Sequence, residues 1–492
     1  MAARAVAYPR VLDGEILAGV AGVRELSRVA YVALSMRFTR LLSLSAFALF
    51  AAYGSVACSG TADSGQAGPD DGGIGGDDSG DAVDAGSTGD GATRHDSGHD
   101  IDGGTTRDGG GVADGGAARD SGVDSGGSQT YPAAHPPMPV LQNNGGPVLA
   151  HPKITTVTFV GDTMAGTLEA FAAGIGATSY WSGATAEYGV GAATAGAPVH
   201  LTEAAPSNID DSAIQSWLAA KLDGTHPEFG TPDANSLYAI YYPSTTTVTL
   251  QGITSCQQFG GYHNSIVLGA KQIAYAVLPR CDWGGQGELD TTTGSASHEF
   301  VEAATDPLPL TSTPAYTGVD ADHAVWEMIL LGEDGDLCAQ FQDSFYKPNG
   351  FNYLVQRAWS NASASGSHDP CAPSLSGQVY FNSAPVLNDT VGFNWQGQAG
   401  QTKGVRIPVG QSKAIELDLY SEAATSAWNL QASDLQSGTL RFAFSQPSGS
   451  NGDKITLTIT VLSQNAQYGG EPFAIISSKG SVKHYWFGFV GN

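Results

Sequence analysis

The chain has 492 residues, enough for more than one folded domain; 41% of them are hydrophobic and 14% are charged. Its formal net charge at pH 7 is −26. Such an acidic balance lacks the basic face that nucleic-acid binding requires, so we expect no nucleic-acid partner.

An export signal is expected at residues 36–58. A short basic stretch precedes an apolar core, residues 41–53, that is too short to span a membrane. The core is followed by Ser-Val-Ala-Cys, which resembles a lipobox and makes Cys58 the expected lipidation site. Ser stands where Leu is usual, so cleavage by ordinary signal peptidase is the alternative. Residues 1–35 carry no targeting signal and are interpreted as a misannotated leader before the true start at Met36, with a genuine long leader as the alternative.

Residues 59–128 form a low-complexity segment. They include 22 Gly, 15 Asp, three Arg and no Lys. Such a composition buries too little apolar surface to offset the entropy of ordering, so we expect a disordered, self-repelling tether. Calcium binding by the Asp-Gly repeats is a weaker interpretation because their spacing is irregular.

From residue 130 to 371, β-branched apolar runs alternate with helical periodicity, which predicts an α/β layer architecture. Strands are expected at residues 153–160, 199–202, 237–242, 246–250, 265–268 and 273–278. Helices are expected at residues 166–180 and after Asp210 and Asp211, whose carboxylates suit the positive end of a helix dipole.

The segment that most suggests a chemical site follows these elements. His298 and Glu302 are four residues apart and project from one face of a helix, with Glu299 about 100° round the axis. In the zincin motif His-Glu-x-x-His, two imidazoles bind Zn²⁺ and the intervening Glu activates water. A carboxylate, also an ordinary zinc ligand, takes the second ligand position here. We therefore expect His298 and Glu302 to bind Zn²⁺ and Glu299 to act as the catalytic base.

We expect this helix to be capped by Asp290 or a following Thr. His-Glu-x-x-Glu also arises by chance on exposed helices, and such a coincidence is the alternative to a metal site.

Flanking segments extend the motif: Ala315-Tyr316, Trp326, Gly332-Glu333-Asp334-Gly335-Asp336-Leu337-Cys338, and upstream Val157-Thr158-Phe159, Tyr188-Gly189-Val190-Gly191, Ser255-Cys256 and Gly261-Tyr262-His263. This pattern resembles the bacterial relatives of the plant phosphate-induced, EXORDIUM-type extracellular proteins, in which a His-Glu-hydrophobic-x-Glu helix precedes a Gly-Glu-x-x-Asp-x-Cys segment. The resemblance covers residues 145–371. It implies a zincin-like site without implying activity, since the plant members are known mainly as wall-associated growth factors.

The resemblance makes Glu333 and Asp336 the leading candidates for the third metal ligand. Both lie in a Gly-flanked turn, where the backbone can present a side chain inward. A solvated acidic loop is the alternative interpretation. Three nearby residues can replace them as ligands: Asp322, His323 and Glu327.

His263 is a candidate catalytic residue, as a hydrogen-bond donor to the transition state. A lone histidine is more often structural, which is the alternative here. Tyr316 and Trp326 are expected to be wall residues of the cleft rather than catalysts.

The chain has five cysteines. Sequence order pairs Cys256 with Cys281 and Cys338 with Cys371, and the second pair would close the loop behind the candidate ligands. Disulfides indicate an oxidising compartment. Zinc ligation by cysteine is disfavoured because no Cys-x-x-Cys spacing occurs.

Residues 372–492 are expected to form an antiparallel β-sandwich. Short runs rich in β-branched or aromatic residues recur at residues 377–382, 391–396, 404–408, 414–420, 440–444, 454–462, 473–478 and 483–489. No catalytic triad or metal cluster is evident there, so this part is expected to bind sugar or cell wall, contact protein, or support the first domain.

Two classes of function remain. The first is an exported zinc hydrolase, a surface lipoprotein or secreted protein, most simply a monomeric metallopeptidase acting on peptide or cell-wall substrates. The second is a non-catalytic extracellular or cell-wall-associated binding protein of EXORDIUM type. Serine chemistry is poorly supported because the sequence has no Gly-x-Ser-x-Gly elbow.

Overall fold

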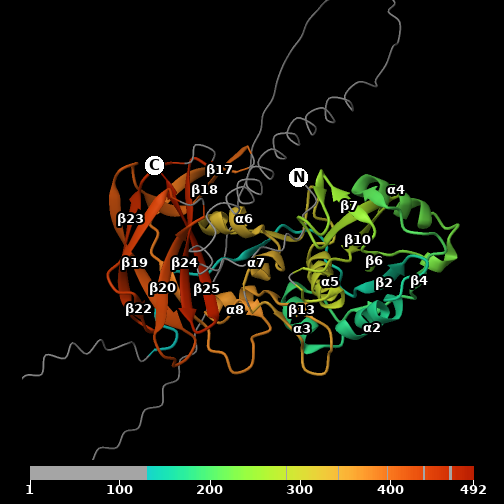
Figure 1. Ribbon diagram of the computed structural model, residues 1–492, viewed down its shortest axis with the longest axis horizontal. Coiled ribbons are helices and arrows are strands. Elements are labelled where there is room, and N and C mark those ends of the chain that lie inside the picture. The colour runs from blue at the N-terminus through green and yellow to red at the C-terminus, as the bar shows by residue number, and fades with distance from the viewer. Residues whose placement is uncertain are drawn as a thin grey trace, which may run out of the picture. The chain divides into compact units, whose positions relative to one another are not determined.

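A mostly parallel sheet organises the first half of the structured chain (Figure 1). The strand order is β3-β2-β6-β10-β9, with β4 also paired to β2. The strands are β2 (Lys153–Thr158), β3 (Thr194–Ala195), β4 (Val199–His200), β6 (Ser236–Tyr242), β9 (Tyr262–Leu268) and β10 (Lys271–Pro279). Only β9 runs antiparallel to its neighbour, β10. Strands form at all six ranges expected from the sequence, five of them in this sheet and Thr247–Leu250 in a separate small sheet. In the central sheet, β-branched and aromatic residues suit strands buried on both faces.

The structure is a computed structural model that describes residues 130–491, except 284, 342, 396, 436–437 and 465–467. The expected leader, the export signal with Cys58 and the tether lie outside these residues. Within the described part of the chain, no helix combines the length and the apolar character needed to cross a membrane.

Helices cover both faces of the central sheet. Leu237, Ala239 and Tyr241 of β6 share a core with α2 (Ala165–Ile175), α3 (Ser179–Thr185) and α5 (Glu288–Thr305). The alternate residues of the same strand share a second core with α4 (Asp211–Lys221) and with the small sheet β5 (Asn208–Asp210), β7 (Thr247–Leu250) and β8 (Ile253–Thr254). The described residues therefore form a layered mixture of helices and sheets, as expected.

The expectation of a single helix at residues 166–180 is wrong in one respect, because the chain forms two helices there, α2 and α3. Gly176 lies so close to Ala193 that a Cβ atom would come within 2.0 Å of the Ala193 carbonyl oxygen. Two residues later, the Thr178 hydroxyl accepts a hydrogen bond from the Trp181 amide at 3.1 Å and caps α3. Local capping thus restarts the helix in a new direction.

Helix α5 is buried on all sides from Thr291 to Thr305. Its first half is rich in Thr, Ser and Ala, whose small side chains let neighbouring elements pack against every face. The expected cap at Asp290 or a following Thr is wrong, because the helix begins at Glu288 after Gly287, which provides no side-chain cap. Asp290 instead lies in the first turn and pairs with Lys347 at 2.8 Å.

Short elements follow α5 and lead towards the second half of the chain. They are β11 (Tyr316–Val319), paired with β1 (Leu141–Asn143); α6 (Ala324–Leu330); α7 (Asp336–Ala339); β12 (Phe345–Tyr346), paired with β13 (Val355–Gln356); β14 (Ala358–Trp359), paired with β15 (Cys371–Ala372); and α8 (Asn361–Ser365). The two disulfides, Cys256–Cys281 and Cys338–Cys371, confirm both expected pairings.

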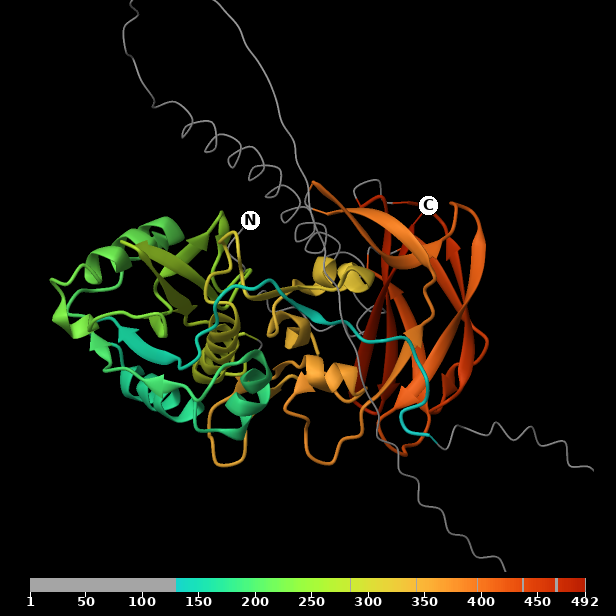
Figure 2. The same cartoon turned by 180° about the vertical axis from the view of Figure 1, so that it is seen from behind.

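Residues 381–491 form two sheets that share one core, seen from two sides in Figures 1 and 2. One contains β16 (Phe381–Pro385), β19 (Ser412–Ser421), β23 (Lys454–Val461) and β21 (Leu440–Phe444). The other contains β17 (Asp389–Trp395), β18 (Gln398–Arg406), β25 (Val482–Gly491), β24 (Gly470–Lys479), β20 (Trp428–Asp434) and β22 (Ser448–Gly449). The sheets are not wholly antiparallel, since β18 and β25 run parallel. The sequence analysis also missed β20 and β22.

Aromatic contacts join α6 to this two-sheet part. The Trp326 ring lies 5.9 Å from that of Trp486 and 4.9 Å from that of Phe487, both in β25. Trp326 also stacks edge-on against Trp359 of β14 at 5.7 Å. A continuous hydrophobic core therefore runs from α6 and β14 into the β-sheets.

Candidate metal centre

Helix α5 brings two of the expected ligands together. His298 Nε2 lies 2.9 Å from Glu302 Oε1, one helical turn further along the chain. The His298 side chain is fully buried, and within the described part of the chain neither of its ring nitrogens has an aligned hydrogen-bond partner. A buried imidazole without such a partner is costly, unless one of its nitrogens donates its lone pair to a metal ion. This arrangement is therefore suited to a cation held between the two side chains.

Asp336 completes the first group of possible ligands. Its Oδ1 atom lies 3.9 Å from His298 Nε2, and its backbone amide donates to Glu302 Oε1 at 3.0 Å. One ligand atom from each of His298, Glu302 and Asp336 lies within 4.8 Å of the others, so the three side chains can hold a metal ion. Asp336 was expected in a Gly-flanked turn, and it is the first residue of the short helix α7, directly after Gly335.

Glu333, the other candidate for the third ligand, lies on a different side of the site. Its Oε1 atom is 3.8 Å from Nε2 of His263, and it belongs to neither group of residues that can hold a metal. The solvated-loop interpretation of this segment is wrong, because Glu333, Asp334 and Asp336 are all buried.

His263 extends the site from the sheet. It pairs with Ala276 across the β9–β10 ladder and so faces the same side as α5. Its Nδ1 atom lies 3.3 Å from Glu299 Oε2 and 3.5 Å from Glu302 Oε2. These three residues form a second group that can hold a metal ion, and Glu302 belongs to both groups.

Two glycines allow the backbone to approach the site closely. A Cβ atom on Gly335 would lie 2.7 Å from His298 Nδ1 and 2.9 Å from Glu302 Oε1. A Cβ atom on Gly261 would lie 2.9 Å from Glu299 Oε1. Any larger residue at either position has to displace a candidate ligand or the candidate base.

The ionisation of the first group follows from its charges. Burial lowers the pKa of His298, but the adjacent Glu302 carboxylate outweighs burial and raises that pKa to about 10. Burial raises the pKa of Glu302, yet the charges of His298 and His263 hold it well below its usual range. In the metal-free protein the pair therefore exists as an imidazolium and a carboxylate, and a cation has to displace a proton from His298.

The pKa values of the neighbouring groups are also changed by burial and by nearby charges. Burial lowers the pKa of His263, but the surrounding carboxylates, led by Glu333, raise it well above its usual value. Burial raises the pKa of Glu299, the expected base. Burial, and then the charge of Glu302, raises the pKa of Asp334 to about 8. A carboxyl group with a raised pKa is better matched to proton transfer near neutral pH.

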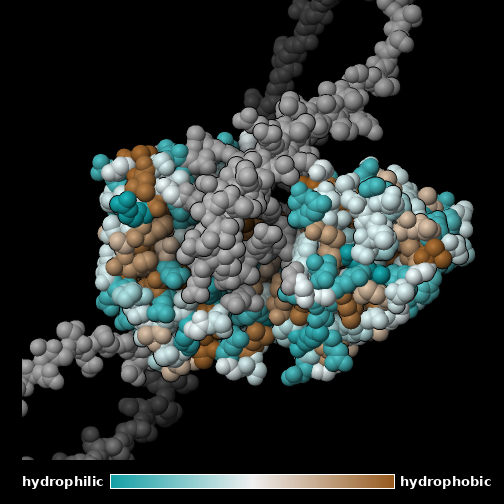
Figure 3. Space-filling view, in the orientation of Figure 1, coloured by the Kyte–Doolittle hydropathy of each residue, from teal (hydrophilic) through white to brown (hydrophobic). Residues whose placement is uncertain are grey.

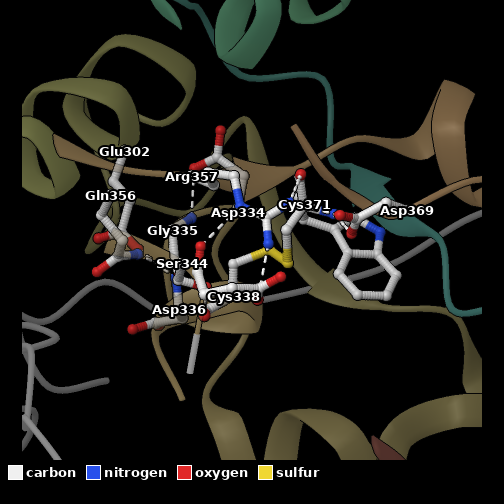
Figure 4. The surroundings of a disulfide bond; sticks show 12 residues. Glu302, Asp334, Gly335, Asp336, Cys338, Ser344, Gln356, Arg357, Asp369 and Cys371 are labelled. Carbon is white, nitrogen blue, oxygen red and sulfur yellow. Dashed lines mark hydrogen bonds and ion pairs between the residues drawn. A yellow bond between two sulfur atoms is a disulfide. The ribbon is translucent and has the colours of Figure 1, made fainter. Parts of the chain in front are cut away.

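A disulfide and a buried arginine hold the loop that carries Asp336. Figure 4 shows the Cys338–Cys371 bond beside this loop, with Glu302 reaching towards it from α5. Arg357 forms ion pairs with Asp369 at 2.5 Å and with Asp343 at 2.8 Å, and it also donates to the Cys371 carbonyl at 2.6 Å. Because the bond links α7 to β15, it restricts the position of Asp336.

Other residues considered from the sequence lie in different surroundings. His323 pairs with Asp320 at 2.8 Å, and Glu327 packs against Gly318 and Gly332. Asp322 is exposed, and none of the three belongs to a group that can hold a metal. Trp326 is not a cleft wall as expected, because it packs against β25. The Tyr316 hydroxyl accepts a hydrogen bond from Asn143 at 3.0 Å.

Sequence reasoning missed three contributors to the site. The Asp306 carbonyl accepts a hydrogen bond from His263 Nε2 at 3.1 Å, Gln356 donates to the Gly335 carbonyl at 2.7 Å, and Asp334 is buried between the two acidic candidates. The Asp-Pro at the end of the helix and the Glu-Asp-Gly-Asp run were visible in the sequence. Nothing in the sequence alone indicated the contact made by Gln356.

No protein-family model matches the chain, and no curated protein matches it either. The chemistry of the site therefore has to be argued from its geometry.

Proposed function

We propose that the protein is an exported, zinc-dependent hydrolase, most simply a metallopeptidase with a zincin-like fold. The observation that carries this proposal is the convergence of His298, Glu302 and Asp336, all buried and within 4.8 Å of one another. Glu299 lies next to these ligands on the same helix. The resemblance to EXORDIUM-type extracellular proteins is consistent with a metal site on this helix.

Each side chain has a separate role in the proposal. His298, Glu302 and Asp336 hold the cation, which when bound supplies Lewis acidity to a substrate carbonyl and to water. Glu299 accepts the proton that the attacking water loses and passes it to the leaving amine. His263 holds the Glu299 carboxylate through its contact with Oε2 at 3.3 Å. Glu333 adds negative charge beside His263 but is not assigned as a ligand.

A peptide is the favoured substrate class because of the strand beside the site. β9 is the last strand in the order β3-β2-β6-β10-β9, and it carries His263. An edge strand offers backbone groups with which an extended peptide can pair. A carbonyl of a peptide bound there would pass close to α5, which packs against β9.

A non-catalytic binding protein of EXORDIUM type is the second candidate. Complete burial of His263, His298 and Glu299 favours it, because a closed site is typical of structural metals. The two-sheet part, with the layout of a β-sandwich, would then supply the binding surface for cell wall or protein.

Metal analysis and hydrolysis assays on the full chain test the assignment. After addition of one molar equivalent of zinc, we expect His298→Ala, Glu302→Ala and Asp336→Ala each to bind that equivalent more weakly than the wild type, because each removes a ligand of this site. Glu333→Ala and the exposed control Asp322→Ala should retain it. Glu299→Gln should keep the metal while hydrolysis of a mixed peptide library falls by roughly 10² to 10⁴.

Two results would contradict the proposal. A wild-type chain that binds no zinc removes the metal site altogether. Metal loss in Glu299→Gln as complete as in His298→Ala makes Glu299 a ligand of this cation instead of the base. If the wild type binds zinc but hydrolyses no peptide, and Glu299→Gln changes neither property, the binding-protein alternative is supported.

We also propose surface anchoring through a lipid on Cys58. The two disulfides of the described residues are typical of an oxidising environment, which agrees with export. Cys58→Ala should move the protein from the membrane fraction to the medium. A mature N-terminus with an unmodified cysteine, measured by mass spectrometry, would show simple secretion.

A further inference from the structure

Side chains of β9 and α5 form a second cluster of ligand atoms. It contains Nδ1 of His263, Oε2 of Glu299 and the Oε2 atom of Glu302, which is not the Glu302 oxygen that lies against His298. All three side chains are buried. This cluster differs from the group of His298 and Asp336, although Glu302 contributes to both.

Distances in this cluster match those between ligands of a small cation. Metal–ligand bonds of about 2.1 Å in a tetrahedral site place neighbouring ligand atoms about 3.4 Å apart. His263 Nδ1 lies 3.3 Å from the Glu299 oxygen and 3.5 Å from the Glu302 oxygen. Good hydrogen bonds between such groups are shorter, near 2.8 Å, so the spacing is better suited to a shared cation.

The hydrogen bond made by Nε2 of His263 determines which of its nitrogens is available to the two carboxylates. Its Nε2 atom lies 3.1 Å from the Asp306 carbonyl oxygen, which can only accept a hydrogen bond. Nε2 therefore carries a proton, and Nδ1 is the atom available to bind a cation. Histidine ligands in metal sites are usually oriented in this way, by a hydrogen bond from the ring nitrogen that does not bind the metal.

Glu299 supplies an independent observation. Its second oxygen, Oε1, is buried and has no hydrogen-bond partner among the described residues. Gly261 lies against this oxygen, so no side chain at that position can serve it. A buried carboxylate with one unsatisfied oxygen is costly, and binding to a cation offsets that cost.

We propose that His263, Glu299 and Glu302 form a second divalent-cation site, and that the Glu302 carboxylate bridges the two cations. This inference rests on the proposed function, because the first cation shares Glu302. When the second cation is bound, Glu299 is one of its ligands. Glu299 acts as the proton acceptor in protein that holds only the first cation. One imidazole and two carboxylates per site suit zinc or manganese.

Cation stoichiometry of the full chain tests the second site. With excess zinc or manganese, mass spectrometry of bound metal should give two equivalents in the wild type. His263→Ala should bind one equivalent, and His298→Ala should also bind one. Glu302→Ala should bind none tightly, because it removes a ligand from both sites. His323→Ala is the matched control and should retain two.

A spectroscopic measurement avoids dependence on the variants. Two manganese ions that share a carboxylate should give an exchange-coupled electron paramagnetic resonance spectrum, whereas isolated ions give separate six-line signals. One equivalent in the wild type, unchanged in His263→Ala, overturns the second site and leaves the proposed function intact. Two equivalents in His263→Ala place the second ion elsewhere and also overturn it. No bound metal overturns both proposals.

Discussion

At the scale of single residues, the site depends on charges that burial makes expensive. His298 and His263 each face more than one carboxylate, and all of these groups lie out of solvent. A buried carboxylate is tolerated only beside a proton or a cation. The two histidines supply protons in the metal-free chain, so protons and metal ions should compete for the same place.

This competition predicts how zinc affinity depends on pH. The pKa of His298 is raised to about 10, so the metal-free ring keeps its proton below that pH and zinc has to displace it. Affinity should rise about tenfold per pH unit between pH 6 and 9 and level off above about pH 10. Chelator competition at several pH values measures this slope. An affinity independent of pH would mean that His298 is not a ligand.

Gly335 should be needed for the metal site rather than for the fold. Gly335→Ala would place a methyl group 2.7 Å from His298 Nδ1 and should weaken zinc binding at least tenfold. Gly166→Ala is the control, because it has open space around it in α2 and should raise stability by up to about 1 kcal/mol. Isothermal titration and thermal unfolding separate the two effects. Unchanged zinc affinity in Gly335→Ala would contradict the close packing of this loop.

At the scale of elements, the site is assembled from three parts far apart in the sequence. β9 supplies His263, α5 supplies His298, Glu299 and Glu302, and α7 supplies Asp336. The helix and the strand are held by the core of the central sheet, whereas α7 is short and depends on its connections. The Cys338–Cys371 bond is the covalent connection nearest to it (Figure 4).

The two disulfides should therefore differ in their effect on metal binding. Replacing either pair with alanine should cost about 2 to 4 kcal/mol of unfolding free energy. Only Cys338→Ala with Cys371→Ala should also lower zinc affinity in protein that is still folded, because it releases the loop of Asp336. The Cys256 and Cys281 pair is the control, since it closes a loop around the β9–β10 hairpin. Equal zinc affinity in the two double variants would contradict this role.

At the scale of the whole molecule, the two halves of the structured chain share a core. Trp326 of α6 and Trp486 of β25 belong to the same hydrophobic cluster, and Thr402 of β18 donates to the Asp322 carbonyl at 3.1 Å. In the described part of the chain, the large apolar residues that remain exposed are far apart in the sequence, and most of them lie in loops. On the face drawn in Figure 3, apolar residues lie in small groups among hydrophilic ones.

Trp326→Ala should test this coupling. Removing a buried Trp typically costs 3 to about 5 kcal/mol, and here the loss should be accompanied by two unfolding transitions in place of one. Val409→Ala, at a half-exposed position, is the control and should change stability by less than about 0.5 kcal/mol. Calorimetry of the full chain distinguishes the two cases. A single transition with a small shift in Trp326→Ala would show that Trp326 does not carry the coupling, and two transitions in the wild type would show that the halves fold independently.

The sequence by itself determined the periodic elements and the chemistry of the helix. Short runs rich in β-branched or aromatic residues located β19 and β21, and the spacing of His298 and Glu302 placed both on one face of α5. Sequence order also paired the four disulfide cysteines correctly. The strands and the helix face depend on local geometry, which neighbouring residues specify.

Only the tertiary structure decided which acidic residue lies with His298 and what lies beside His263. Glu333 and Asp336 are three residues apart and look equivalent in the sequence, yet the turn at Gly335 directs them to different sides of the site. The break at Gly176 and the parallel pairing of β18 with β25 also depend on contacts between distant segments. Such contacts arise when separate elements pack together, so no local pattern in the chain encodes them.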